Sequence, residues 1–493
     1  MPVIYRNGNY YGSNNSGHLI QDKNDFNFPV RSILKFNDAE VQDDETEDRT
    51  VVSPHELTDA ELEQIVFPLP VDKPKDYVVY AFKINGDESD PSKAVTPYES
   101  DYGCMNRNFT PAHMNFTSGV FDYGSWTGNE FFFPKPCMLK SDGTVDYYLD
   151  SSDYTKKEDG TASDVANASY DGNAMMEFPT IYFKRWQVNK ISYCVISNQQ
   201  LTKDFKAYAH MDVNGEVADK TYIAIYDGAL VSGKLRSLSG YTANTATSTT
   251  ANRIMTYTTR QEEVNYAKAN NVRTDCEGWS TWHKADRDMV NDLLILLGMN
   301  LNTQATFGRG RDTGYVSTSN TGMVATGSMN NKGLFWGENA GAAGVKVFGI
   351  ENWWGNVWKA VQGLINANGT QKVKMTYGKE DGTDVYGYNF DGTGYRVIDG
   401  ATPAGTSGDY INGYKYSRQG LVAYQVSGTD STYLCDGMWF NNGQNNYALA
   451  GGSSHSGLLC GAFYVDCYGL ASGRSWAYGA ALTFKKLKDA QSA

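Results

Sequence analysis

The sequence predicts an α+β protein that is rich in strands and loops, with a small β-rich region at its N-terminus. Three observations predict this fold class. The 493 residues include 50 Gly and 34 Tyr, a composition that favours turns and aromatic-rich sheets over helical bundles. Short runs of alternating polar and apolar residues recur between turn residues, which is typical of strands. In the second half of the chain, helical spacing is convincing only over residues 281–297.

Charge and composition exclude several classes of function. The net charge is −13 without a run of Lys or Arg, which argues against a nucleic-acid-binding surface. No stretch approaches the length of a membrane span, and the first residues lack the apolar core of a secretory signal. We therefore expect that the protein is made in a cytoplasm and does not insert into a membrane. The seven scattered Cys lack C-x-x-C spacing and predict reduced, mostly buried thiols. We expect no metal or cofactor.

The N-terminal fifth of the chain divides into two predicted regions. Residues 1–52 are too few for an independent core, so we expect a β-rich anchoring region that packs against copies of itself or a neighbouring protein. Residues 53–95 read as a linker, in which the T-D-A-E pattern at Thr58 predicts a short helix. The alternation over 76–85 adds a strand. The remainder, 96–493, is then one large domain.

Several elements of the large domain are predicted in order along the chain. A Ser-Asp-Gly turn between strand-like runs predicts a hairpin over 129–150. Residues 172–184 read as one buried strand, with 191–196 as its partner. The helix over 281–297 is expected to end with Gly298 as its C-terminal cap.

Residues 349–363 contain three Trp around Gly355 and Asn356. This clustering predicts a tight turn packed inside an aromatic core, although exposed tryptophans of this kind can also stack on sugars. Just upstream, Arg309 and Arg311 do not complete a phosphate-binding loop, and we expect them to hold carboxylates or backbone carbonyls.

The stretch 451–484 combines a stiff frame with chemically varied insertions. The frame is small or bulky and apolar, and it consists of Gly451, Gly452, Gly461, Ala462, Phe463, Trp476, Gly479, Leu482 and Phe484. The varied positions are Ser453, His455, Ser456, Leu459, Asp466, Tyr468, Gly469, Gly473, Ser475 and Ala477. Period-2 alternation predicts that Phe463 and Val465 point inward, whereas Tyr464, Asp466 and Tyr468 point outward. This pattern is typical of a binding surface and also of a solvated sheet edge.

Residues 349–363, read with Gly451-Gly452 and the closing 476–484, resemble the C-type-lectin-like fold of the formylglycine-generating-enzyme branch, where G-N-V-W and R-G-G-S-like elements recur. More narrowly, the chain resembles the variable proteins of diversity-generating retroelements in phages and prophages, the group that includes the major tropism determinant. Segments 135–148 and 282–310 support the resemblance, which covers about 96–484 and leaves out the first 93 residues.

In that family, adenine-specific copying errors diversify asparagine codons, and a family-like template places asparagines at the ten varied positions. Randomising both adenines of such a codon never yields Lys, Glu, Gln, Met or Trp, and all ten residues obey this restriction. Two positions depart from the family pattern, because Ser454 replaces a usual Trp and Tyr478 a usual Ile.

The resemblance implies a tropism-determining, receptor-binding protein of a phage tail, located in the virion and made in the host bacterial cytoplasm. Its variable region, about 436–484, would bind a host-cell-surface receptor, protein or glycan. Family resemblance also implies a homotrimer. The N-terminal region lies outside the resemblance, and we infer that it attaches to other tail proteins. We expect no catalytic residues and no enzymatic activity.

Two alternatives remain open: a formylglycine-generating-type cysteine oxidase that uses Cys460 and Cys467, and a purely structural tail-fibre component. The alternation places Cys467 on the inward face, where a thiol is a poor nucleophile.

Overall fold

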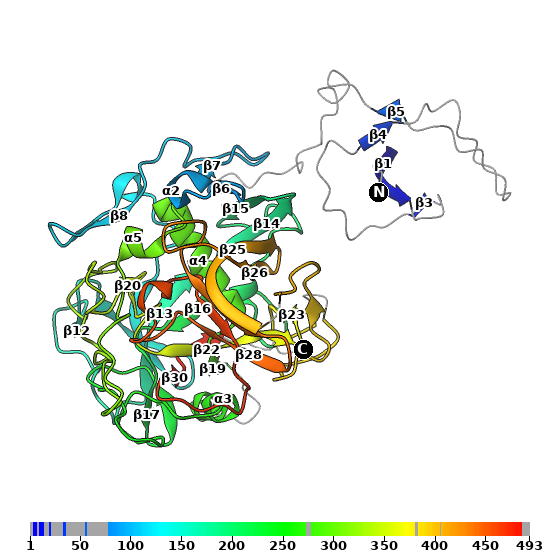
Figure 1. The fold of residues 1–493 in the computed structure, drawn as a ribbon. Helices are drawn as coiled ribbons and strands as arrows, with labels where there is room; N and C mark the ends of the chain where they lie inside the picture. The colour runs from blue at the N-terminus through cyan, green and yellow to red at the C-terminus, as the bar shows by residue number, and fades with distance from the viewer. Residues whose placement is uncertain are drawn as a thin grey trace, which may run out of the picture. The chain divides into compact units, whose positions relative to one another are not determined.

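The computed structural model describes residues 77–272, 278–379, 383–404 and 406–485, together with five short strands in the first 75 residues (Figure 1). The chain forms two compact units, Met1–Lys75 and Asp76–Ala493. Among the described residues, no helix is long and apolar enough to cross a membrane.

The first unit contains a five-stranded sheet of order β3-β2-β1-β4-β5. Its strands are β1 (Val3–Arg6), β2 (Asn9–Ser13), β3 (Leu19–Ile20), β4 (Ile33–Lys35) and β5 (His55–Glu56). Strand β1 pairs antiparallel with β2 and parallel with β4. The helix predicted to begin at Thr58 lies outside the described residues.

The predicted strand over 76–85 exists, but it does not belong to a linker that extends to residue 95. It forms β6 (Val79–Asn85), which pairs along its full length with β15 (Ile191–Ser197) inside the second unit. Helix α2 (Pro91–Ala94) then leads into β7 (Val95–Pro97), which returns along β6. The reason is burial: Tyr80, Phe82 and Ile84 of β6 lie in the main hydrophobic core.

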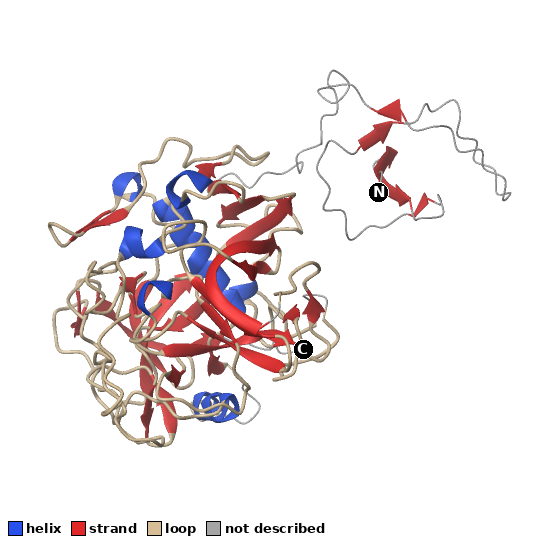
Figure 2. Cartoon of the chain, in the orientation of Figure 1, coloured by secondary structure: helices blue, strands red, loops and turns tan. Residues whose placement is uncertain are grey.

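The second unit is strand-rich, as predicted, and its strands form three larger sheets (Figure 2). The four-stranded sheet has the order β14 (Tyr182–Val188), β15, β6, β7. The seven-stranded sheet has the order β12 (Asp153–Lys157), β11 (Val145–Asp150), β10 (Lys135–Lys140), β13 (Gly172–Pro179), β16 (Lys220–Ala224), β31 (Leu482–Lys485) and β19 (Trp279–Thr281).

The third sheet carries most of the C-terminal region. Its order is β24 (Arg396–Val397), β23 (Thr370–Val373), β22 (Trp358–Ala367), β28 (Asn445–Ala450), β29 (Val465–Cys467), β27 (Gly437–Asn441), β25 (Thr406–Ser417) and β26 (Gly420–Val426), and β30 (Tyr478–Gly479) pairs with β22. Short two-stranded pairs complete the unit: β8 (His113–Asn115) with β9 (Val120–Asp122), β17 (Ala229–Val231) with β18 (Lys234–Arg236), and β20 (Lys346–Val347) with β21 (Ile350–Glu351).

The predicted hairpin over 129–150 is confirmed as β10 and β11, which pair antiparallel across the Ser-Asp-Gly turn. The single strand predicted over 172–184 is wrong, because the chain leaves the seven-stranded sheet at Pro179 and starts β14 of the four-stranded sheet at Tyr182. Proline lacks the N–H that a continuing ladder would need. The predicted partner over 191–196 is correct for the second half, since β15 pairs with β14.

The predicted helix is α4 (Lys284–Gly298), which is buried at every position except the half-buried Asn291. Figure 1 shows it in the interior of the unit, between the sheets. Residue Gly298 is not the cap, because the left-handed residue is Met299, at φ 46°. A Cβ on Gly298 would lie 2.7 Å from the Thr306 side chain of α5 (Thr303–Phe307), so glycine allows the two helices to approach closely.

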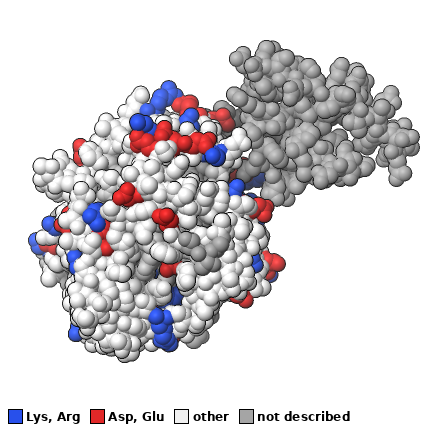
Figure 3. All heavy atoms as spheres, in the orientation of Figure 1, with Lys and Arg blue, Asp and Glu red and all other residues white. Residues whose placement is uncertain are grey.

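On the face of the molecule drawn in Figure 3, charged side chains gather at the upper rim and along the edges. Uncharged atoms cover most of the area between them. This distribution agrees with the low share of charged residues in the sequence, 20%.

Candidate ligand-binding surface

The turn at 352–356 (the Trp turn) supports the first of the C-terminal loops. Residues Trp353 and Trp354 are fully buried, and the rings of Trp353 and Trp282 lie 4.4 Å apart. The prediction of a tight turn inside an aromatic core is therefore confirmed. The left-handed conformation occurs at Gly355 and Asn356, with φ of 76° and 64°. The indoles of Trp353 and Trp354 cannot stack on a sugar, because neither ring is exposed.

A buried ion pair fixes the polar groups of this turn. The Nζ atom of Lys359 lies 3.0 Å from Oδ1 of Asp227, and neither side chain is exposed. The other oxygen, Oδ2, accepts from the amide groups of Asn352 at 2.8 Å and Asn356 at 2.6 Å. The ammonium also donates to the backbone carbonyls of Asn352 and Gly355. Burial lowers the pKa of Lys359, while the neighbouring carboxylate of Asp227 opposes that shift.

The same turn positions the start of the varied stretch. The backbone N–H of Gly355 donates to the carbonyl of Gly451, and that of Ser454 donates to the carbonyl of Asn356 at 3.1 Å. A Cβ on Gly451 would lie 3.0 Å from backbone atoms of the Trp turn, so glycine is required for this approach. The loops that follow therefore start from a rigid base.

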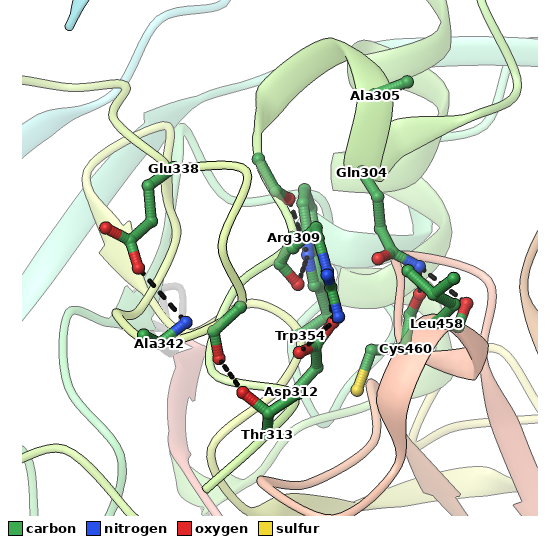
Figure 4. Close-up of polar contacts among 12 residues, drawn as sticks. Gln304, Ala305, Arg309, Asp312, Thr313, Glu338, Ala342, Trp354, Leu458 and Cys460 are labelled. Carbon is green, nitrogen blue, oxygen red and sulfur yellow. Dashed lines mark hydrogen bonds and ion pairs between the residues drawn. The ribbon is translucent and has the colours of Figure 1, made fainter. Parts of the chain in front are cut away.

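The first loop, 453–459, is tied to the region around α5 (Figure 4). The side-chain amide of Gln304 donates to the carbonyls of Leu458, at 2.8 Å, and Cys460. The backbone N–H of Gly457 donates to the carbonyl of Asp312, whose carboxylate pairs with Arg309 at 2.8 Å. The prediction that the arginine at 309 holds a carboxylate is confirmed.

The arginine at 311 donates to the carbonyls of Gly322 and Ala342, as the sequence also predicted. The contact with Gly322 fixes the segment that contains Tyr315, and the N–H of Tyr315 donates to the carbonyl of Ser454 in the first loop at 3.3 Å.

The second loop, 468–476, lies on α3 (Arg260–Lys268). The N–H of Arg260 donates to the carbonyl of Ala471 at 3.0 Å. The guanidinium of Arg474 contacts Glu262 at 2.7 Å and the carbonyl of Tyr257 at 2.9 Å, and the N–H of Tyr257 donates to the carbonyl of Ser475. The loop is thus held at both ends and along its length.

An aromatic cluster joins the two loops at the surface. The rings of Tyr315 and Trp476 stack with centroids 3.6 Å apart and planes 7° apart, and His455 lies edge-on to Tyr315 at 5.3 Å. The prediction that Trp476 is a buried frame residue is wrong, because it is half-buried, with the ring of Tyr315 stacked on it and the ring of His455 6.4 Å away. Tyrosine 257 lies close by, in a left-handed conformation with φ 60° that non-glycine residues rarely adopt.

The ten varied positions divide by burial into three groups. The exposed ones are His455 and Tyr468. The half-buried ones are Ser456, Leu459, Gly469, Gly473 and Ser475. The buried ones are Ser453, Asp466 and Ala477. Seven of the ten positions therefore reach the surface to some degree, while the other three lie at the bases of the loops.

The predicted alternation around β29 is wrong for two residues. Residue Tyr464 is 2% exposed and its hydroxyl accepts from the indole N–H of Trp439 at 2.7 Å; Asp466 is 8% exposed. The ring of Tyr464 packs on Trp358 with centroids 4.5 Å apart, and the carboxylate of Asp466 accepts from the N–H of Tyr468, so other residues cover the face that the alternation assigned to solvent. Only Tyr468, just beyond the strand, points outward as predicted, with 46% exposure.

Sequence reasoning missed Tyr257 and Tyr315, which come from loops far from the varied stretch. No local pattern marks either of them, because only the fold brings them to Trp476. The exposed Leu458 was also missed, since it lies between two varied positions without being one of them.

The two cysteines of the oxidase alternative are both buried, at 0% and 1% exposure for Cys460 and Cys467. Burial raises the pKa of each thiol well above its usual range. The Cys460 thiol donates to the carbonyl of Ser453 at 3.5 Å. The six cysteines that the structure describes are free thiols, and its described residues contain no His, Cys, Asp and Glu cluster that could hold a metal ion.

No protein-family model matches the chain, and no curated protein matches its sequence.

Proposed function

We propose that this chain is a receptor-binding, tropism-determining protein of a phage tail. In this proposal, the large unit has a C-type-lectin-like fold of the formylglycine-generating-enzyme branch, and loops 453–459 and 468–476 form a surface that a retroelement diversifies. The first unit would attach the protein to other tail proteins, in a homotrimer.

One observation carries the proposal: varied side chains lie on the outside of loops whose bases are locked into a buried frame. Beneath the first loop, this frame is fixed by the turn at 352–356 and by the buried ion pair between Asp227 and Lys359. Binding sites require this combination, because a rigid scaffold holds surface side chains in place while their chemistry changes. Residues His455 and Tyr468 supply the exposed rings that are typical of adaptable binding surfaces.

The chemistry of the surface favours a protein receptor over a glycan. Segment 453–478 contains no Asn, Gln, Glu or Lys. Its Asp466 is buried and its Arg474 is paired with Glu262. No carboxylate, amide or ammonium group of this segment is therefore free to bind sugar hydroxyls, whereas Leu458, Tyr468 and Leu470 expose 39–47% of their surfaces for apolar contact.

The direct test is attachment of the protein to a susceptible cell. We expect the double variant His455→Ala and Tyr468→Ala to abolish attachment, because both side chains lie outside the frame, while the melting temperature stays unchanged. The control is Thr117→Ala, an exposed change on the hairpin of β8 and β9. Attachment by the double variant at the wild-type level would contradict this surface as the binding site.

A genomic test addresses diversification separately. The flanking DNA should encode a reverse transcriptase and an adenine-rich near-copy of codons 436–484. If both are absent, the diversification is refuted, although a fixed receptor-binding surface would stand.

The burial of Cys460 and Cys467 argues against the oxidase alternative. A buried thiol with a raised pKa is a poor nucleophile, and both Cys460 and Cys467 are in this state. Cysteine-oxidase activity that disappears in Cys467→Ala would revive it. Loops identical in sequence across sibling genomes would instead favour a structural tail-fibre component.

A further inference from the structure

The buried position Asp466 has contacts that a ligand-binding side chain would not have. Its backbone is fixed on both sides, since Asp466 pairs with Trp439 of β27 and with Leu449 of β28. Its carboxylate oxygen Oδ1 accepts from the backbone N–H of Tyr468 at 2.7 Å. The N–H of Gly469 is a second hydrogen-bond donor to this carboxylate. The side chain therefore closes the first turn of loop 468–476.

A buried arginine lies below the same turn. Residue Arg260 is 2% exposed, and its Nη2 atom lies 2.6 Å from Oε1 of Glu263. Its Nε and Nη1 atoms have no hydrogen-bond partner among the described residues. The guanidinium interacts electrostatically with Asp466 and lies 5.4 Å from the ring centroid of Tyr478. The guanidinium thus interacts with two carboxylates, and one of them is the carboxylate that closes the loop.

Two hydrogen bonds extend this arrangement along the loop. The carbonyl of Tyr468 accepts from the side-chain amide of Gln444 at 3.0 Å, and the carbonyl of Gly469 accepts from the N–H of Tyr447 at 3.1 Å. The backbone at 468–469 therefore has its N–H groups bound by Asp466 and its carbonyls bound by β28 and the turn before it. A change at position 466 therefore removes the side chain that accepts from these N–H groups, while the hydrogen bonds to the two carbonyls stay.

We propose that Asp466 is a positioning residue, which sets the conformation of loop 468–476 and does not touch the ligand. The proposal rests on the proposed function, in that this loop is part of the binding surface. Ser453 has the equivalent place in the first loop, where its hydroxyl accepts from the N–H of His455 at 3.4 Å. The varied positions then act in two ways: exposed residues change the contacts of the surface, and buried residues change its shape.

Hydrogen exchange of the purified full chain tests the proposal without any receptor. In Asp466→Ala, two backbone N–H groups lose a charged acceptor, so peptides covering 465–478 should exchange roughly tenfold faster or more. Peptides covering β22 should be unchanged. The conservative variant Asp466→Asn keeps one acceptor oxygen, so it should restore protection at Tyr468 and leave Gly469 faster. A merely space-filling role would give wild-type exchange throughout the asparagine variant, because Asn and Asp have nearly the same volume, and faster exchange in the alanine variant alone.

Unchanged exchange in the alanine variant would overturn the proposal. If β22 also exchanges faster in the alanine variant, that variant is generally destabilised, and the test then depends on Asp466→Asn. Wild-type exchange at Gly469 in Asp466→Asn would overturn the proposal. The control Thr117→Ala, an exposed change on the hairpin of β8 and β9, should leave exchange at 465–478 unchanged. If the loop responds to changes at 466 while the double variant of His455 and Tyr468 still attaches to cells, the proposed function fails and the positioning role stands.

Discussion

Two tryptophan-containing segments of this protein have opposite environments. At 352–358, Trp353 and Trp354 are buried beside an ion pair with no exposed atoms. At 474–478, Trp476 is half-buried, and its neighbour Arg474 makes an ion pair that is 48% and 37% exposed. Both segments combine Trp with small residues, so residue type does not separate frame from surface. What separates them is whether a second layer of the fold covers the segment.

The largest effect should come from breaking the buried ion pair. In Lys359→Met, Asp227 loses its cationic partner in the interior, which costs about 3–5 kcal/mol of unfolding free energy. The matched control is Arg474→Met, whose exposed pair with Glu262 is worth about 1 kcal/mol or less. Denaturant unfolding measures both. Equal losses in the two variants would remove the distinction between frame and surface.

Replacing a buried tryptophan should likewise destabilise the protein more than replacing the half-buried one. We expect Trp354→Ala to cost about 3–5 kcal/mol, because it leaves a cavity in a closed core. The change Trp476→Ala should cost only about 0.5–1.5 kcal/mol, since it removes one stacking partner at the surface. Thermal unfolding measures both changes. A Trp476 variant that fails to fold would show that this residue belongs to the frame after all.

The pH dependence of stability should identify Asp466 as buried. Burial raises the pKa of its carboxyl to about 6, above the ordinary value of about 3.9 in the unfolded chain. The folded state therefore binds the proton of this carboxyl more tightly than the unfolded chain does. Protonated Asp466 stabilises the folded state fully below about pH 4, and this stabilisation is lost as the pH rises through about 6.

Between about pH 7.5 and about pH 5, the wild type should thus gain about 1 kcal/mol relative to Asp466→Asn. Because all other titrating groups are the same in the wild type and in Asp466→Asn, their effects on stability cancel in this difference. A constant difference across this window in urea unfolding would contradict the raised pKa.

The smallest effect on stability should come from the exposed varied residues. Either His455→Ala or Tyr468→Ala should change the unfolding free energy by about 0.5 kcal/mol or less, as at other surface positions. A much larger loss from either change would show that its side chain supports the loop and would sharpen the boundary between the two regions.

The fold was predictable where a pattern is local. The hairpin of β10 and β11 followed from its turn residues, and α4 followed from its apolar spacing. The break at Pro179 was missed because a run of apolar residues hides the change from one sheet to another. The boundary at Lys75 was also missed, since the partner of β6 lies more than a hundred residues further along the chain.

The candidate surface was predictable in outline. The chemically varied stretch identified the exposed His455 and Tyr468, and the glycines and Phe463 were correctly placed in the frame. Alternation failed at Tyr464 and Asp466, because it assumes that one face of a strand meets water, whereas Trp358 and the loop after β29 cover that face.

The sequence by itself determined the strand-rich class, the Trp turn and the stretch in which side-chain chemistry varies, because turns and spacing are properties of neighbouring residues. Only the tertiary structure decided that Trp476 stacks on Tyr315, that Asp466 closes a loop beside Arg260, and that both cysteines of the varied stretch are buried. Burial depends on which distant segments cover a residue, and no local pattern of the chain records that.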